Sequence, residues 1–343
     1  MYWMHILISL LSTLFTPIRG LVLKLAAPPD ILLNDIKNGR PACHFTVPPS
    51  EDGRREVIKR FITTFLNGID YTLARSNEER RKALCKALLL GFSEHRHNVW
   101  FEDMCRQSAA MAELAYHEHP FEEQLQIASF TWFMLYIDDL CSKFPGSLQR
   151  FQHSILSNKD SDHGVLTHFR AHLLDMYNFW DTAAANGIIT AAMEFVNGCA
   201  LEEMPELRNM TLSVSARSWP YFLRMKTGVA QAYAFMIFPR HSNPDISGFI
   251  QVIGDISLFI DLTNDILSFY KEDLAGETKN YVHNRACMNR QPVLDVLNNI
   301  LYEALAAQAR VTATLHNTES VKQWSTFIKG YGFSPNTKTL PNE

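Results

Sequence analysis

Apolar residues recur at helical spacing along the chain from Arg54 onward, and this pattern is the strongest constraint on the fold. One such series is Ile58, Phe61, Ile62 and Phe65, whose spacing of three and four residues places them on one face of an α-helix. No strand-type alternation or hairpin signal extends over a comparable length. The sequence therefore predicts an all-α fold.

Proline and glycine residues divide this helical pattern into segments. After the first two helices, we expect further helices at 102–117, 121–141, 164–186, 188–203, 218–237, 245–272, 292–313 and 318–330. The result is a bundle of about ten helices, large enough for some helices to be buried on every side.

The chain has 343 residues and no linker rich in Gly, Ser or Pro, which favours one large domain, assigned to residues 54–331. Residues 1–53 read as an N-terminal extension, apolar over 1–16 and proline-rich over 27–52. The apolar stretch is short for a transmembrane helix, and it lacks the basic region and the A-x-A site of a signal peptide. We therefore expect no membrane contact.

Composition narrows the class of protein. With 47% hydrophobic and 20% charged residues, the chain has the balance of a soluble globular protein. Its 32 basic and 36 acidic residues give a net charge of −4, without the basic excess of a nucleic-acid binder. The six cysteines form no C-x-x-C motif, so we expect a reducing, cytoplasmic location and neither a cysteine zinc site nor a disulfide framework. A homodimer remains open.

Two acids, Asp138 and Asp139, end the nearly uninterrupted apolar run of segment 121–141. Adjacent carboxylates at the end of a buried helix repel each other unless cations neutralise them. Magnesium suits such a place because it prefers oxygen ligands and combines one or two carboxylates with substrate phosphates. The alternative is that both acids are solvated at a helix end, so this motif alone does not decide the function.

A second motif, Asn264, Ser268 and Glu272, has a spacing of four and eight residues. On a helix these side chains form a column of amide, hydroxyl and carboxylate oxygens along one face. An oxygen-only column can chelate a hard cation. The alternative is an ordinary solvated polar stripe, which the strongly apolar turns just before Asn264 disfavour.

The stretch N-D-x-x-S-x-x-K-E at Asn264–Glu272, preceded by Y-I-D-D-L at Tyr136–Leu140, resembles the metal motifs of class I terpene synthases. It is most similar to the fungal trichodiene synthase group, which includes longiborneol-type sesquiterpene cyclases. The resemblance runs from about Arg54 to Tyr331. It implies a single-domain helical bundle around a central active-site cavity that binds farnesyl diphosphate and three Mg²⁺ ions.

The resemblance also implies roles for individual residues. Asp138 would bind metal from the aspartate-rich helix, and Asn264, Ser268 and Glu272 would bind it from the other helix. The reaction it implies is metal-dependent ionisation of farnesyl diphosphate, release of diphosphate and cyclisation of the carbocation to a sesquiterpene.

Arg224 and Gly228 match the diphosphate-sensing arginine of that family and the helix break that follows it. Glycine inside a helix costs about 1 kcal/mol relative to alanine, so Gly228 needs a reason to be there. Lys226 and Lys271 are further candidates to bind the diphosphate. The alternative is that Arg224 is a surface cation and Gly228 a helix-packing contact.

Residues one or two turns before the two metal motifs are candidates to line the cavity, although packing alone explains them equally well. They are Thr131, Met134, Leu135, Ser257 and Ile260.

The C-terminal tail, residues 332–343, departs from the family because it lacks the usual Arg-Tyr pair. No arginine follows Arg310, and Lys329 or Lys338 would replace the pair only in part, since lysine has no bidentate fork. Two other functions stay open, the first because it also uses metal-bound diphosphate on an all-α fold and the second because of the altered tail. One is an isoprenyl diphosphate synthase, which normally has two D-D-x-x-D motifs, and the other is a noncatalytic ligand-binding or scaffold homologue.

Overall fold

The computed structural model of the protein describes residues 51–72, 76–95 and 99–331. Within these ranges every regular element is an α-helix or a 3-10 helix, which confirms the predicted all-α fold. Each of those helices is too short or too polar to cross a membrane. Nearly all of the predicted N-terminal extension, and the C-terminal tail with its missing Arg-Tyr pair, lie outside the described residues.

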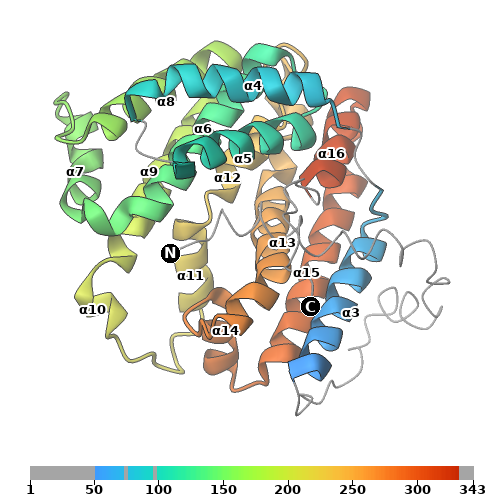
Figure 1. Cartoon of the computed structure of the whole chain (residues 1–343). Helices are drawn as coiled ribbons and strands as arrows, with labels where there is room; N and C mark the ends of the chain where they lie inside the picture. Colours follow the sequence, from blue (N-terminus) through green and yellow to red (C-terminus); the bar gives the residue numbers. More distant parts are fainter. Residues whose placement is uncertain (1–50, 73–75, 96–98, 332–343) are drawn as a thin grey trace.

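The described chain contains fourteen α-helices (Figure 1). They are α3 (Glu51–Gly68), α4 (Glu78–Gly91), α5 (Val99–Ala115), α6 (Phe121–Leu140), α7 (Pro145–Leu156), α8 (Gly164–Phe179), α9 (Thr182–Glu202), α10 (Pro205–Arg208), α11 (Trp219–Thr227), α12 (Ala230–Met236), α13 (Ile253–Leu274), α14 (Tyr281–Asn289), α15 (Val293–Thr314) and α16 (Thr318–Tyr331).

Several predicted boundaries were wrong, and the local chemistry explains why. Prolines were expected to separate helices, but Pro145 and Pro205 each begin one, α7 and α10. The first helical position tolerates proline because its missing N–H would have no partner there. The predicted segment 164–186 is interrupted at Asp181, whose side chain accepts a hydrogen bond from Ala183 N and caps the start of α9.

Two helices form the centre of the bundle. Helix α6 is buried on every side over its last turns, where each residue from Phe130 to Asp138 is buried. Helix α13 packs against α12, α15 and α3 and lies between α11 and α15 in Figure 1. Because both central helices carry the predicted motifs, the fold places those motifs inside the molecule.

Aromatic side chains fix the position of α6 against α4 and α8. The rings of Phe92 and Trp132 stack with centroids 3.9 Å apart, and Phe133 meets Phe92 edge to face at 5.0 Å. Phe169 of α8 lies 4.9 Å from Phe133. Aromatic pairs of this kind contribute roughly 0.5–1.5 kcal/mol each beyond the area that they bury. The cluster therefore holds these three helices in register.

Candidate active site

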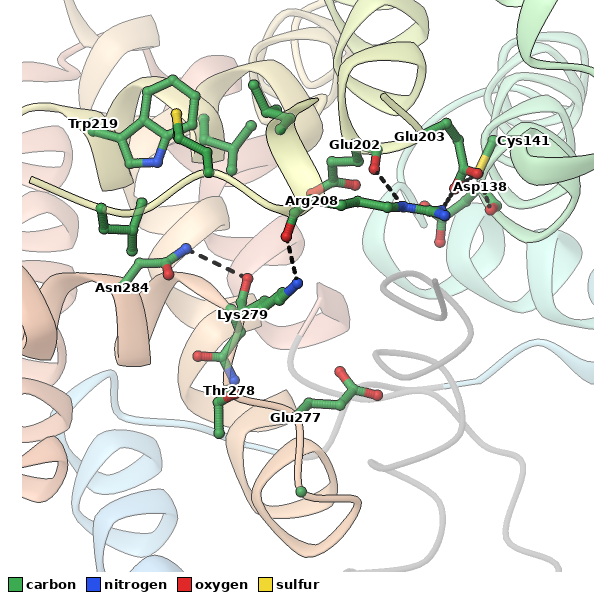
Figure 2. Close-up of a pocket in the computed structure, with 16 residues that line it drawn as sticks. Asp138, Cys141, Glu202, Glu203, Arg208, Trp219, Glu277, Thr278, Lys279 and Asn284 are labelled. Atoms are coloured by element: carbon green, nitrogen blue, oxygen red, sulfur yellow. Dashed lines mark hydrogen bonds and ion pairs between the residues drawn. The ribbon is translucent and has the colours of Figure 1, made fainter. Parts of the chain in front are cut away.

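Asp138 and Asp139 have different environments at the end of α6. Asp138 is only 6% exposed and lines a cavity of about 530 Å³ (Figure 2). Asp139 is half-buried and accepts a hydrogen bond of 2.7 Å from the indole N–H of Trp100. The two acids are thus not a solvated helix end, and Asp138 is the one that faces the cavity.

The three residues of the second motif lie inside the protein. Asn264, Ser268 and Glu272 of α13 are 8%, 0% and 2% exposed, so they do not form a solvated stripe. Burial raises the pKa of Glu272 to about 7, against the lowering effects of the nearby Ser268 hydroxyl and of Asn280. Asn280 Nδ2 donates a hydrogen bond of 2.8 Å to Glu272 Oε2.

This column has the donor set of a magnesium site. Among the described residues, Ser268 Oγ and Glu272 Oε1 are buried without a well-formed hydrogen bond. Oxygen atoms left in this way are costly, because burial removes the water that would otherwise bind them. A hard cation that accepts lone pairs from amide, hydroxyl and carboxylate oxygens would satisfy both atoms. The residues present therefore fit a Mg²⁺ ion.

Asn280 connects the two motifs in space. Its side chain binds Glu272 at the end of α13, and the residue also lines the cavity that Asp138 faces. The end of the column and the acid of α6 therefore belong to one region of the molecule, although 134 residues separate Asp138 from Glu272 in the chain.

Arg224 of α11 is buried against α13 and is not a surface cation. Its Nε donates to Asp265 Oδ1 at 2.9 Å, and its Nη1 lies 3.1 Å from Asp261 Oδ1. Its Nη2 donates to Asn264 Oδ1 at 3.1 Å. Burial raises the pKa of Asp261 and Asp265, while the guanidinium of Arg224 counteracts that rise.

Asp261 and Asp265 were not predicted from the sequence to be site residues. The available signal was their spacing, since two acids four residues apart share one face of a helix. Their partner could not be found from spacing, because Arg224 belongs to a different helix.

The predicted helix 218–237 is broken beside Arg224. Helix α11 ends at Thr227 and α12 starts at Ala230, with Val229 in the left-handed region at φ 44°. A Cβ on Gly228 would lie 2.2 Å from Asp261 Oδ1 and 2.3 Å from Arg224 Nη1. Glycine is therefore required because the backbone approaches this ion pair closely.

The structure separates the two lysine candidates. Lys226 forms an ion pair with Glu194 of α9 and lies 5.6 Å from the ring of Phe222, so it does not join the cluster on α13. Lys271 is half-buried near the end of α13. Binding of diphosphate by either lysine stays a prediction.

The cavity candidates on α6 are buried, and Thr131 accepts a hydrogen bond of 3.1 Å from the hydroxyl of Tyr233. Ile260 is also buried, while the hydroxyl of Ser257 donates to Ile253 O at 2.7 Å. Contact with a substrate stays a prediction for all of them.

Charged residues that the sequence did not single out close one side of the cavity (Figure 2). Arg208 Nη2 lies 2.6 Å from Glu203 Oε1, and its Nε donates to Glu202 O at 3.0 Å. Lys279 Nζ donates to Arg208 O at 2.9 Å. These contacts connect α10 with the segment before α14.

The fold is that of the class I terpenoid synthases. The crystal structure of linalool/nerolidol synthase from Streptomyces clavuligerus, in complex with 2-fluorogeranyl diphosphate, superposes with a TM-score of 0.52 at 12% sequence identity. The alignment covers 84% of this chain and 97% of that one. The likeness confirms the predicted fold class.

The chain belongs to the trichodiene synthase family, whose family model (TRI5) matches residues 96–333. Terpene synthase BipA of Cochliobolus sativus is 35% identical over 222 residues, 64% of this chain and 68% of that protein. Longiborneol synthase CLM1 of Gibberella zeae is 26% identical over 217 residues, 62% of this chain and 64% of that protein. The predicted family is thus confirmed, and the protein is an enzyme, a terpene synthase.

Proposed function

We propose that this terpene synthase is a sesquiterpene cyclase that ionises farnesyl diphosphate in the presence of Mg²⁺ and releases diphosphate. The observation that supports this most directly is the buried oxygen column of Asn264, Ser268 and Glu272, in which two oxygens have no well-formed hydrogen bond among the described residues. A bound cation would stabilise buried oxygen atoms arranged in this way. The proposed catalytic domain is residues 54–331.

In this proposal Asp138 holds Mg²⁺ from α6, and Asn264, Ser268 and Glu272 hold it from α13. When bound, the metal ions supply positive charge that stabilises diphosphate as a leaving group. Asp138 and Glu202 are two carboxylates that line the cavity, and we propose that they hold divalent ions there.

Arg224 is the proposed diphosphate-binding residue of the chain itself. A guanidinium presents a planar fork of donors that matches phosphate oxygens. All three of its nitrogens are engaged by Asp261, Asp265 and Asn264, so we infer that diphosphate competes with these acceptors for the arginine. Lys271 is the second proposed cation.

The hydrocarbon part of the proposed mechanism depends on excluding water from the carbocation. Apolar and aromatic walls serve this purpose, since ring faces also stabilise positive charge. Met134 and Leu135 are buried on α6 before Asp138 and are the proposed wall residues, although they do not line the cavity that Asp138 faces.

Farnesyl diphosphate is the proposed substrate because the two motifs resemble those of sesquiterpene cyclases, and longiborneol synthase is among the relatives of this chain. The structural neighbour carries an analogue of the shorter geranyl diphosphate, so substrate length needs a direct test. Chain elongation is disfavoured, because the second motif is N-D-x-x-S-x-x-K-E and not a second aspartate-rich motif.

The test incubates the purified chain with farnesyl diphosphate, with geranyl diphosphate, or with farnesyl and isopentenyl diphosphate together. Each mixture is run with Mg²⁺ and with a chelator, and both diphosphate release and hydrocarbon products are measured by mass spectrometry. We expect release from farnesyl diphosphate only with Mg²⁺, together with a cyclic product. Two results would contradict the proposal. One is diphosphate release that requires isopentenyl diphosphate, and the other is turnover of geranyl diphosphate without turnover of farnesyl diphosphate.

A further inference from the structure

Three metal-ligating side chains meet at a place that the proposed reaction does not use. Glu94 and His95 lie on the 3-10 helix Ser93–His95 that follows α4, and His168 lies on α8. His95 Nε2 and His168 Nδ1 are 3.2 Å apart. Glu94 Oε1 is 3.3 Å from His95 Nε2 and 3.6 Å from His168 Nδ1.

These three distances describe the face of a tetrahedral metal site. Zinc binds imidazole nitrogen and carboxylate oxygen at about 2.0–2.2 Å, so neighbouring ligand atoms in a tetrahedral site are separated by roughly 3.3–3.6 Å. Two imidazoles and one carboxylate, with the fourth position open to water, form a known ligand set for zinc. The observed triangle has edges of 3.2, 3.3 and 3.6 Å, close to that range.

Hydrogen bonding satisfies only part of the triangle when both imidazoles are neutral. If both imidazoles are neutral, a single proton between Nε2 of His95 and Nδ1 of His168 leaves the accepting nitrogen facing the carboxylate of Glu94 as well. Two acceptors then face each other. A cation at the centre would instead accept a lone pair from each of the three atoms.

The surroundings hold both rings in place before any ion binds. His95 is buried and its ring stacks 5.9 Å from Trp132, while Phe92 lies 5.1 Å from the His168 ring. These contacts belong to the aromatic cluster that fixes α4, α6 and α8, which run along the same end of the molecule in Figure 1. Glu94 is largely exposed, so an ion can reach the site from solvent.

We propose that Glu94, His95 and His168 form a second metal site, one that takes a transition-metal ion such as Zn²⁺. Its nitrogen ligands distinguish it from the oxygen-only column on α13, because imidazole favours zinc and related metals whereas magnesium takes oxygen ligands. A bound ion connects the end of α4 to α8 and so stabilises the support of α6. The site is independent of the substrate and the product of the enzyme.

The first experiment titrates Zn²⁺ into the intact protein by calorimetry, with excess Mg²⁺ present to occupy oxygen sites. We expect one Zn²⁺ per chain and a rise in melting temperature. Removing a residue that hydrogen-bonds to a metal ligand lowers metal affinity by about 10–100-fold. His168→Gln and Glu94→Gln remove proposed ligands themselves, so the affinity for Zn²⁺ should fall by at least that factor in each variant. His153→Gln, at an exposed position of α7, is the matched control and should bind like wild type.

A spectroscopic experiment identifies the ligands. Co²⁺ in a tetrahedral site with nitrogen ligands absorbs visible light much more strongly than Co²⁺ in an octahedral oxygen site. We expect strong bands in the wild type and in Ser268→Ala, and their loss in His168→Gln. Glu94→Gln changes an exposed side chain, so its result does not depend on whether the histidine variant folds. Absence of Zn²⁺ binding, or binding and bands that persist in both Glu94→Gln and His168→Gln, would overturn the proposal.

Discussion

Arg224 and Asn264 are bound to each other: Nη2 of the arginine donates to Oδ1 of the asparagine at 3.1 Å. That amide oxygen is the atom through which Asn264 is proposed to hold a metal ion. The same guanidinium is held through Nε by Asp265. In the proposed mechanism, Asn264 therefore gives up its hydrogen bond to Arg224 when its amide oxygen binds the metal ion. The same change makes a donor of Arg224 available to diphosphate.

The oxygen column gives the first prediction. Replacing one column residue by alanine should lower the turnover number by about 100-fold or more, in each of the variants Asn264→Ala, Ser268→Ala and Glu272→Ala. Each substitution removes a ligand of the metal ion whose positive charge stabilises the transition state. Ser268→Ala should not lower the melting temperature, since its hydroxyl makes no well-formed hydrogen bond among the described residues and its burial is costly. Steady-state kinetics and thermal melting check this.

Ser325→Ala on α16 is a control for the same substitution on another helix. Wild-type turnover in any two of the three column variants would contradict the metal-site assignment.

Asp138 and Asp139 of α6 should contribute differently to turnover. Asp138→Asn should lower turnover and raise the Mg²⁺ concentration needed for activity, because Asp138 faces the cavity. Asp139→Asn should have a smaller effect, since an asparagine oxygen can still accept the hydrogen bond from Trp100. Turnover measured against Mg²⁺ concentration tests the difference. Equal and small effects would show that neither acid holds a metal ion.

The helix break should depend on glycine at position 228. Gly228→Ala brings a methyl group within 2.8 Å of the backbone oxygen of Arg224 and still closer to the ion pair with Asp261. Overpacking of this kind costs about 1–3 kcal/mol, and we expect that loss in the free energy of unfolding together with reduced turnover.

Gly254→Ala is the matched control, because nothing lies within 4 Å of its Cβ position and it is exposed on α13. It should be neutral or stabilising by up to about 1 kcal/mol. Urea unfolding compares the two variants. A Gly228→Ala variant as stable and as active as Gly254→Ala would show that the close approach is not needed.

A buried histidine should contribute to acid sensitivity. Burial, with a smaller effect of nearby His168, lowers the pKa of His172 from 6.5 to about 3. Below pH 6.5 the unfolded chain binds a proton at this residue and the folded chain does not, so acid favours unfolding. The loss amounts to about 1.4 kcal/mol per pH unit between pH 6.5 and 3.

His172→Leu should reduce that slope by the same amount, as measured by urea unfolding between pH 7 and 4.5. Replacing the exposed His153 by Gln should leave the slope unchanged. An unaltered slope in His172→Leu would contradict a neutral buried imidazole.

Local patterns in the sequence were sufficient to predict the column on α13. Residues four and eight apart share a helix face by backbone geometry alone, so Asn264, Ser268 and Glu272 needed no knowledge of the tertiary structure. Helix content was predictable for the same reason. Helix starts were less predictable, because a proline such as Pro145 or Pro205 can either end a helix or occupy its first position.

By itself, then, the sequence determined the all-α class, the family motifs and the residues that share each helix face. Only the tertiary structure decided that Arg224 binds Asp261 and Asp265. It also decided that Lys226 forms an ion pair with Glu194, and that His168 of α8 contacts His95, which follows α4. The physical reason is that periodicity is a property of one helix, whereas a contact between helices depends on how every helix packs. Helix packing brings together residues that no spacing in the chain relates.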